Sequence, residues 1–386
     1  MVLEETKTRL FALSKQVTPE WLAAEINACI TQIERNMERF GTKFPSAEAT
    51  NGKYRIKEND DWTNGFWTGM LWLAYEWTND AKFYTRAMEN IESFNTRLAD
   101  HIVLDHHDIG FLYSLSAGAG YKITGNRLCK AELLKAADVL LARYHPRGAF
   151  IQAWGAYGSE NEYRLIIDSL INLPLLFEAS KLSGDPKYGE VAQKHYQTVL
   201  QTVIRDDATT FHTHYFDPAT GQPTCGVTHQ GNRDTSIWAR GQSWAVLGIP
   251  LNQSFLATPY PKNYGAIVDV MLENLPADLV PYWDFDFTDH NPSAKDSSAL
   301  AITACGLLEA AQVAAYPKAQ QLACGMLYQL GEQYAAKTQP ENEGLLLHGV
   351  YAHATGKGVD EPNLWGDYFY LEALMRVARP DWQRYW

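Results

Sequence analysis

The amino-acid sequence predicts an all-α fold, an (α/α)6 barrel of six helical hairpins with a short β-hairpin insertion. Three observations lead to this prediction. Apolar helical segments alternate with amphipathic ones, short turns containing Gly or Asn separate them, and no Pro- or Ser-rich linker divides the 386 residues. A helix that is apolar on all sides is buried, whereas an amphipathic helix covers a buried surface. The pattern therefore favours an inner and an outer ring of helices in a single domain spanning residues 1–386.

Each hairpin pairs one apolar segment with one amphipathic segment. The predicted inner helices are residues 65–77, 108–121, 168–180, 240–249, 296–309 and 367–377. The predicted outer helices are residues 21–40, 81–98, 128–144, 188–203, 263–275 and 318–336. Alternation around a turn predicts the β-hairpin within residues 210–231. An open solenoid of stacked hairpins is the alternative to a closed ring.

Glycine is frequent in the inner segments, although each Gly costs about 1 kcal/mol against Ala inside a helix. Close contacts between neighbouring helices would offset this cost, which favours the ring over the solenoid.

Composition and charge exclude several classes of protein. Asp and Glu number 45 against 33 Lys and Arg, a net charge of -12, so non-specific binding to nucleic acid or to an anionic membrane is not expected. Five scattered cysteines without a CxxC pair exclude a disulfide framework and a zinc ribbon. No signal-peptide pattern and no apolar run of about 18 residues is present. We expect a cytoplasmic protein. The sequence does not indicate its oligomeric state.

Polar residues stand where the apolar segments begin. They are Asn64, Asp108, Asp168, Arg240, Asp296 and Asp367. An Asp in such a position is often only a helix N-cap. In a ring, however, all inner helices run the same way, so these side chains would gather at one end. Aromatic residues lie beside them in a chain with 12 Trp and 21 Tyr, and aromatic rings form stacking surfaces for sugars.

Two carboxylates are the candidate catalytic groups. Asp168 follows Ile166 and Ile167, and such an apolar setting raises the pKa of a carboxyl and makes it a proton donor near neutral pH. A helix N-terminus acts in the opposite direction by stabilising the anion, and the sequence does not decide between the two effects. Asp108 follows His106 and His107. A pair of carboxylates is the usual equipment of a glycosidase.

Neither a metal nor another cofactor is expected. His106, His107 and Asp108, or His212 and His214 on one face of a strand, offer ligand atoms, but no carboxylate or Cys lies at ligand spacing beside the second pair. Hydrogen bonding to substrate hydroxyls is the favoured use of these histidines. Phosphate-binding glycine loops and a GxSxG nucleophile elbow do not occur in the sequence.

Arg240 opens an otherwise apolar helix in the motif WARGQSW (238–244). A buried Arg needs an anionic partner, which either the protein or a ligand such as a uronate carboxylate or a sulfate would supply.

Eight motifs together resemble those of the unsaturated glucuronyl hydrolases, and they run in order from residue 61 almost to the C-terminus. They are DWTNGFW (61–67), HHDIGFL (106–112), IIDSLINLP (166–174), GVTHQG (226–231), WARGQSW (238–244), YWDF (282–285), DSSA (296–299) and LWGDYFYLE (364–372). The (α/α)6 barrel of that family agrees with the fold predicted from the helical pattern.

The resemblance implies a glycoside hydrolase that needs no cofactor. Its substrates would be unsaturated glycosaminoglycan disaccharides or short oligosaccharides, which carry a Δ4,5-unsaturated uronate at the non-reducing end. The enzyme would protonate C4 of this vinyl ether and add water at C5, and the resulting hemiketal would collapse and break the glycosidic bond. The alternatives are an unsaturated rhamnogalacturonyl hydrolase and a non-catalytic sugar-binding toroid.

Residue roles carried over from the family follow its motifs. Asp168 matches the general acid/base and Asp108 the second essential carboxylate. The residues expected to bind substrate are Trp62, Asn64, His107, Trp154, His212, Gln230, Arg240, Trp244, Tyr351, Thr355 and Lys357.

Sulfate recognition in the family is associated with a Ser-x-x-Ser-x-Lys stretch before the last inner helix. The corresponding segment has Ala352, Thr355 and Lys357, so the first hydroxyl is missing and the second is a Thr. The sequence therefore predicts that sulfated chondroitin disaccharides are cleaved without a large preference over unsulfated ones.

Overall fold

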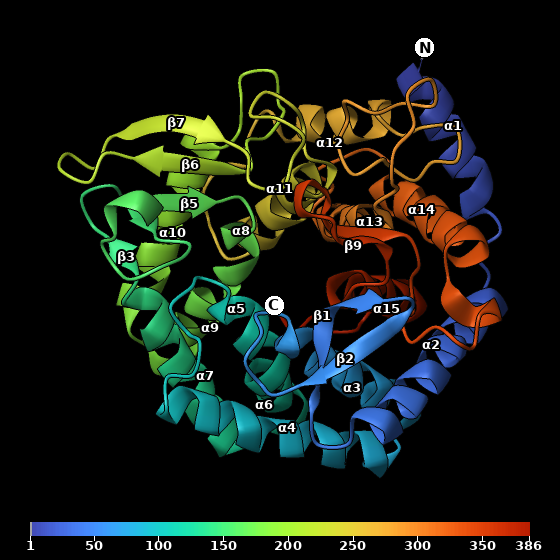
Figure 1. Cartoon of the computed structure of the whole chain (residues 1–386), viewed down its shortest axis with the longest axis horizontal. Helices are drawn as coiled ribbons and strands as arrows, with labels where there is room; N and C mark the ends of the chain where they lie inside the picture. The colour runs from blue at the N-terminus through green and yellow to red at the C-terminus, as the bar shows by residue number, and fades with distance from the viewer. Residues whose placement is uncertain (1) are drawn as a thin grey trace.

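The computed structural model describes residues 2–386, and helices dominate it (Figure 1). Six helical segments form an inner ring. Four of them are single helices, and two are divided into shorter consecutive helices. The inner elements are α3 (Asn64–Thr78), α5 (Ile109–Tyr113) with η1 (Ser114–Gly118) and α6 (Ala119–Thr124), α8 (Ser169–Asn172) with α9 (Pro174–Ser183), α11 (Ala239–Gln253), α13 (Ser297–Gln312) and α15 (Leu364–Ala378). Almost every residue of α11, α13 and α15 is buried, as expected for helices enclosed by others.

Amphipathic helices cover the inner ring from outside. They are α2 (Pro19–Phe40), α4 (Ala81–Ala99), α7 (Arg127–Leu141), α10 (Pro186–Thr202), α12 (Tyr264–Glu273) and α14 (Ala319–Gln333). The N-terminal helix α1 (Val2–Ser14) packs against α14 and α12.

The ring is closed, because α15 packs against α3 and α2 as well as against α13. Glycines allow the inner helices to approach closely. A Cβ at Gly110 would lie 2.4 Å from Cα of Asn172 on α8, and a Cβ at Gly306 would lie 2.7 Å from backbone atoms of α11. The expectation that these glycines permit tight helix contacts is therefore confirmed, and the open solenoid is wrong.

The predicted inner and outer segments are all helical, with small differences at their ends. The segment predicted as 128–144 ends at Leu141, and Tyr144–His145 is instead strand β3. The last inner helix begins at Leu364, before the predicted start at Asp367. Helix α1 was not predicted.

The expectation of an all-α protein with one β-hairpin is wrong in detail, because residues 2–386 contain four small sheets. They are β1 (Phe44–Thr50) with β2 (Lys53–Lys57), β3 (Tyr144–His145) with β4 (Phe150–Ile151), β5 (Arg164–Ile166) with β6 (Thr213–Phe216) and β7 (Pro223–Val227), and β8 (Gly349–Ala352) with β9 (Lys357–Glu361). The predicted hairpin is β6–β7, which β5 extends to three strands. Strands β3 and β4 have only two residues each, too few for a clear alternation in the sequence, and the longer β1 is buried along almost its whole length and so does not alternate.

In residues 2–386, no helix combines the length and the hydropathy needed to span a bilayer.

Candidate active site

The two candidate carboxylates meet at one histidine. Nε2 of His107 lies 3.3 Å from Oδ1 of Asp108 and 3.3 Å from Oδ1 of Asp168. His107 is buried, and the side chain of Asp168 is 18% exposed, more than that of either neighbour. Asp108 precedes α5 and Asp168 precedes α8, so the starts of two adjacent inner helices bring this triad together.

The environments of the two carboxylates move their pKa values in opposite directions. Burial raises the pKa of Asp168, and this effect exceeds the opposing influence of His107. Burial also disfavours the charged form of Asp108, but His107 and His106 outweigh it and hold the pKa of Asp108 well below its usual range. Burial opposes charge on His107 too, yet the two carboxylates raise its pKa to about 9. At neutral pH His107 is thus an imidazolium and Asp108 an anion.

Helix capping does not explain these two carboxylates. Asp108 and Asp168 occupy the N-cap positions of α5 and α8, but neither side chain accepts a hydrogen bond from the first turn. Asp296 at the start of α13 does not cap its helix either. Their oxygens are left for other partners, which is unusual for an Asp at an N-cap.

Hydrogen bonds fix the two helix starts relative to each other. The amide of Asn172 accepts from the backbone N–H of Phe111 at 2.8 Å and so joins α8 to α5. The N–H of Asp108 donates to Nδ1 of His106 at 3.0 Å, and Nε2 of His106 contacts the carbonyl of Val103 at 2.9 Å.

His195 supports the start of α8 next to Asp168, and the sequence analysis did not identify it. It comes from the outer helix α10 and is fully buried, and Ile151 N–H donates to its Nδ1 at 2.9 Å. Its Nε2 lies 2.8 Å from Oγ of Ser169, the residue after Asp168. Burial lowers the pKa of His195 to about 3, so this side chain is neutral. Its position on the buried face of an amphipathic segment was the only signal in the sequence.

Arg240 has protein partners, which answers the question that the sequence left open. Its Nη1 donates to Oδ2 of Asp296 at 2.8 Å, and its Nη2 donates to the side chain of Gln230 at 2.8 Å and to the carbonyl of Tyr351 at 2.7 Å. Only 3% of the Arg240 side chain is exposed. Arg240 therefore ties α13, the loop at Gln230 and β8 together, and its anionic partner is Asp296.

Aromatic rings lie next to this network. Trp62 stacks on Trp365, with centroids 5.3 Å apart and planes at 25°, and its Nε1 donates to the hydroxyl of Tyr351 at 2.9 Å. Trp62, Trp154 and Tyr351 are each half-buried. One face of Trp154 is covered by the guanidinium of Arg164, 4.5 Å from the ring centroid.

Trp244, which the sequence predicts as a substrate-binding residue, is buried. Its side chain is 1% exposed and packs against Phe111 and Phe369 with centroids 5.6 Å away in each case. Its contact with substrate stays a prediction.

Two further polar residues predicted from the sequence, His212 and Asn64, are buried. His212 is buried, and the N–H groups of His229 and Gln230 donate to its Nδ1 at 2.9 and 3.0 Å. Burial holds the pKa of His212 well below its usual value, so it is neutral with the proton on Nε2. Asn64 is fully buried, and its Oδ1 accepts from the N–H of Asp61 at 2.8 Å.

Thr355 and Lys357 lie at the exposed edge of the site. Thr355 is exposed, and its hydroxyl donates to the carbonyl of Ala352 at 3.2 Å. The Lys357 side chain is 47% exposed; its Nζ lies 3.9 Å from the ring centroid of Tyr351 and 3.8 Å from Oε2 of Glu48. The position of Lys357 over Tyr351 connects this edge to Trp62.

His107, Asp108 and Asp168 also form the one three-residue group in residues 2–386 that could hold a metal ion. A histidine ligand must be neutral, whereas the two carboxylates raise the pKa of His107 to about 9. The donor set thus favours a proton over a metal at His107. His214, the other candidate ligand, instead bonds through Nδ1 with the carbonyl of Tyr215 at 3.0 Å.

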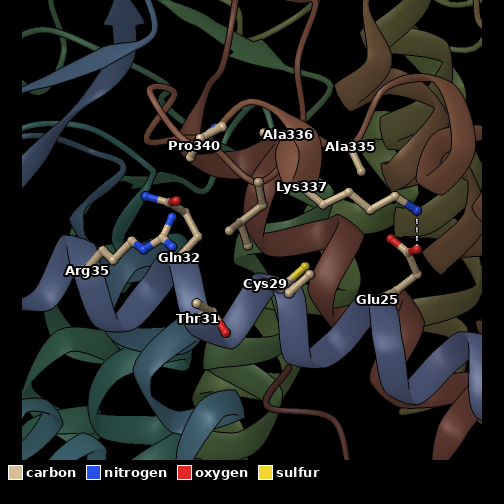
Figure 2. Close-up of a pocket in the computed structure, with 12 residues that line it drawn as sticks. Glu25, Cys29, Thr31, Gln32, Arg35, Ala335, Ala336, Lys337 and Pro340 are labelled. Carbon is tan, nitrogen blue, oxygen red and sulfur yellow. Dashed lines mark hydrogen bonds and ion pairs between the residues drawn. The ribbon is translucent and has the colours of Figure 1, made fainter.

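A separate pocket lies on the outer wall, between α2 and the segment that follows α14 (Figure 2). Figure 2 shows Glu25 paired with Lys337 there, beside Cys29 and Gln32. This pocket contains none of the candidate catalytic residues.

A ring of helical hairpins with two carboxylates of opposite pKa shift beside aromatic rings is the arrangement of a glycoside hydrolase. The chain belongs to glycosyl hydrolase family 88, whose family model matches residues 32–375.

Named relatives agree with this assignment. The chain is 46% identical over 379 residues to the unsaturated chondroitin disaccharide hydrolase of Streptococcus pneumoniae, a match that covers 96% of this chain and 95% of the relative. It is 42% identical over 352 residues to the unsaturated glucuronyl hydrolase of Bacillus sp., covering 89% and 93%. The crystal structure of unsaturated glucuronyl hydrolase from Streptococcus agalactiae superposes with a TM-score of 0.93 at 43% identity, covering 96% and 94% of the two chains.

Proposed function

We propose that this enzyme releases the Δ4,5-unsaturated uronate from the non-reducing end of glycosaminoglycan oligosaccharides by hydrating its C4=C5 double bond. The observation that carries the proposal is the triad, in which one imidazolium stands between a carboxyl with a raised pKa and a carboxylate with a lowered one. Protonation of an alkene carbon needs an acid that still holds its proton near neutral pH. Of the two carboxyl groups, Asp168 is better suited as this acid, because burial raises its pKa whereas the pKa of Asp108 is lowered.

The first step is proton transfer from the carboxyl of Asp168 to C4 of the sugar, which leaves positive charge at C5 and the ring oxygen. Water then attacks C5 and gives its proton to the carboxylate of Asp168, which restores the acid. The C5 hemiketal collapses to a ketone by breaking the bond from C5 to the ring oxygen, and the proton of the C5 hydroxyl passes to that oxygen. C1 is then a hemiacetal, which collapses to an aldehyde; the glycosidic bond breaks and the remaining sugar leaves with the hydroxyl proton on its oxygen. The sum is the addition of one water molecule, so neither a metal nor a redox cofactor is required.

Asp108 and His107 would act on the charge that develops in this reaction. The carboxylate of Asp108 is held ionised beside the position where positive charge appears at C5 and the ring oxygen, and it accepts hydrogen bonds from ring hydroxyls. His107 fixes the spacing of the two carboxyl groups and carries a positive charge that favours an anionic uronate.

The other binding residues would recognise the sugar by stacking and by hydrogen bonds. Trp62 and Trp154 are half-buried rings suited to sugar faces. Asn64 Nδ2 and His107 Nδ1 are buried nitrogen atoms without a hydrogen-bond partner within residues 2–386. Buried polar groups usually have partners, so a bound ligand is a reasonable source of them.

A sulfated disaccharide fits the exposed edge at Lys357. A solved mutant of the unsaturated glucuronyl hydrolase from Streptococcus agalactiae, complexed with dGlcA-GalNAc6S, matches this chain with a TM-score of 0.85 at 40% identity. Lys357 and Thr355 would offer one cation and one hydroxyl to a sulfate. Arg240 is less suited to that role than the sequence suggested, because Asp296 already neutralises it.

The ring of six hairpins is, in this proposal, an (α/α)6 barrel that forms one catalytic domain over residues 1–386. We also propose a cytoplasmic location, which fractionation of cells that produce the enzyme would test.

The decisive experiment follows the ultraviolet absorbance of the double bond while the protein acts on disaccharides that lyases release from chondroitin, hyaluronan and heparin. We expect the absorbance of at least the chondroitin disaccharides to disappear with turnover. An unsaturated rhamnogalacturonan disaccharide serves as the control for the related activity. If none of the glycosaminoglycan disaccharides reacts, the proposed function is wrong.

A further inference from the structure

A buried arginine on the outer ring is tied to two loops of the candidate active site. Arg97 lies in the last turn of α4, and none of its side chain is exposed. Its four hydrogen bonds all go to carbonyl oxygens. Nη1 donates to the side-chain Oδ1 of Asn59 at 3.1 Å and to the backbone carbonyl of Asp61 at 2.9 Å. Nε donates to the backbone carbonyl of Ile102 at 3.0 Å, and Nη2 donates to the backbone carbonyl of Val103 at 2.9 Å. A buried guanidinium normally pairs with a carboxylate. Here the N–H groups of the guanidinium instead join two segments of the chain, residues 59–61 and residues 102–103.

Both stretches lead directly into catalytic segments. The first, residues 59–61, precedes Trp62 and Asn64 at the start of α3. The second, residues 102–103, precedes His107 and Asp108 at the start of α5. From the outer helix α4, the side chain of Arg97 thus bonds to the residues that precede both of these inner helices.

A short path of hydrogen bonds connects Arg97 to the backbone of Asp108. The carbonyl of Val103 accepts from Arg97 and from Nε2 of His106, and Nδ1 of His106 accepts the N–H of Asp108. If the carbonyl of Val103 moved, His106 would lose its anchor and the N–H of Asp108 would lose its acceptor.

The loop that Arg97 holds has a strained backbone. His101 and Val103 have φ values of +49° and +47°, and a β-branched residue is rarely found at positive φ. Such strain persists only where surrounding contacts fix the conformation. The side chain of Val103 is mostly exposed and does not hold the loop, whereas the bonds from Arg97 to the two consecutive carbonyls do.

The same arrangement recurs after the next two outer helices. Arg143 follows α7 and donates to the carbonyls of Gln152 and Gly155, both at 2.9 Å, on either side of Trp154. Arg205 follows α10 and donates to the carbonyls of Asp234 at 3.0 Å and Ser236 at 3.2 Å, in the loop before α11. In three successive hairpins, an Arg in the last turn of the outer helix or up to three residues after it therefore binds carbonyls of a loop that leads to an inner helix or to Trp154. A cation at a helix C-terminus is also stabilised by the helix dipole.

We propose that Arg97 is a positioning residue for the hydrolysis: by holding residues 59–61 and 102–103 together, it sets the distance of Asp108 and His107 from Asp168. This inference rests on the proposed function. A misplacement of about 1 Å at a catalytic group can reduce the rate by about 10²-fold, so loss of the Arg97 contacts should lower kcat far more than it raises KM.

The test compares Arg97→Lys with Arg86→Lys, a change of the same kind on the same helix α4 that involves no active-site loop. Lys keeps the charge of Arg97 but cannot bond to four carbonyls at once. For Arg97→Lys we expect kcat on an unsaturated chondroitin disaccharide to fall about 10- to 100-fold. We expect Arg86→Lys to retain the wild-type kcat and KM.

The pH–rate profile separates positioning from general stability. His107, Asp108 and Arg240 are the charged groups that face Asp168, and His107 is the strongest of them in lowering its pKa. If Arg97→Lys lets His107 and Asp108 move away, the alkaline limb that reports protonated Asp168 moves to higher pH. A variant that merely folds less well would melt earlier but keep the wild-type profile below its melting temperature.

The outcomes are distinct. A reduced kcat with a shifted profile in folded Arg97→Lys supports the inference, and an unchanged kcat or an unchanged profile overturns it. If Arg97→Lys does not fold, His106→Ala is tested in its place. This change removes the hydrogen bonds from His106 to Val103 and Asp108 and leaves Arg97 unchanged. An unshifted pH–rate profile of His106→Ala also overturns the inference. A wild-type enzyme inactive on every glycosaminoglycan disaccharide would refute the proposed function instead.

Discussion

Replacement of His107 by Gln should move both limbs of the pH–rate profile to higher pH. The imidazolium of His107 lies 3.3 Å from an oxygen of each carboxyl group. At this distance, and with an effective dielectric constant of about 20, Coulomb's law sets an upper bound of about 5 kcal/mol for each contact, from which the cost of burying the charges is subtracted. Gln retains a hydrogen-bond donor near this position but removes the charge. The two carboxyl groups would then face each other without the cation that separates their pKa values.

The sign follows from the causes of the pKa shifts. His107 lowers the pKa of Asp168 and of Asp108, so its loss raises both. The alkaline limb, which reports protonated Asp168, should move up by about one to three pH units, the usual effect of a close opposite charge. The acid limb, which reports ionised Asp108, should rise from very low pH into the measurable range. Because the pair titrates together, the limbs give apparent values for both groups.

The assay is kcat/KM on an unsaturated chondroitin disaccharide from pH 3 to pH 10, measured by loss of ultraviolet absorbance. His290→Gln, a change of an exposed histidine, is the control and should keep the wild-type profile. If His107→Gln loses activity evenly at every pH, with neither limb displaced, the imidazolium does not set the two pKa values. In that case the division of roles between Asp168 and Asp108 would need another cause.

Four further changes have defined outcomes. Asp168→Asn should reduce kcat by about 10²-fold or more without lowering the melting temperature, because it removes only the titrating proton; a variant that retains over a tenth of wild-type kcat would exclude the acid/base role. Arg240→Met should reduce the free energy of unfolding by about 3–5 kcal/mol, as measured by urea titration, because buried Asp296 loses its partner; an unchanged midpoint contradicts this. Lys357→Ala should lower kcat/KM for sulfated chondroitin disaccharides and leave the unsulfated one unaffected, and an unchanged ratio of the two would mean that Lys357 does not contact sulfate. Addition of EDTA should leave wild-type activity unchanged, and loss of activity restored by a divalent metal would overturn the expectation of no metal.

The sequence predicted the helices well, because each inner segment is apolar on all sides and each outer one is amphipathic. It also located the starts of the inner helices at Asp108, Asp168 and Asp296. What it missed depends on tertiary contacts. The short strands β1 and β2, for instance, are stabilised by partners far along the chain, such as Glu343, which accepts from the N–H of Tyr54 at 2.8 Å.

Partners and orientations within the site were harder to predict than residue identities. The sequence indicated that Arg240 is buried with an anion, but only the structure identifies Asp296 as that anion. The WARGQSW motif contains Trp238 and Trp244, and nothing in it shows that Trp244 packs beneath Phe111. Arg97 resembles any basic residue in the last turn of an amphipathic helix, so its four bonds to carbonyls had no counterpart in the sequence.

The division of labour between the two carboxyl groups has a cause that can be read in the residues before them. Both Asp side chains stand at the N-cap of an inner helix, so the helix dipole acts on both in the same way and cannot make them differ. Asp108 is preceded by two histidines, and both hold its pKa down. Asp168 is preceded by two buried isoleucines, and the burial that raises its pKa prevails over the influence of His107. The two positions are alike in the ring, but the two histidines lower the pKa of Asp108 whereas burial raises the pKa of Asp168.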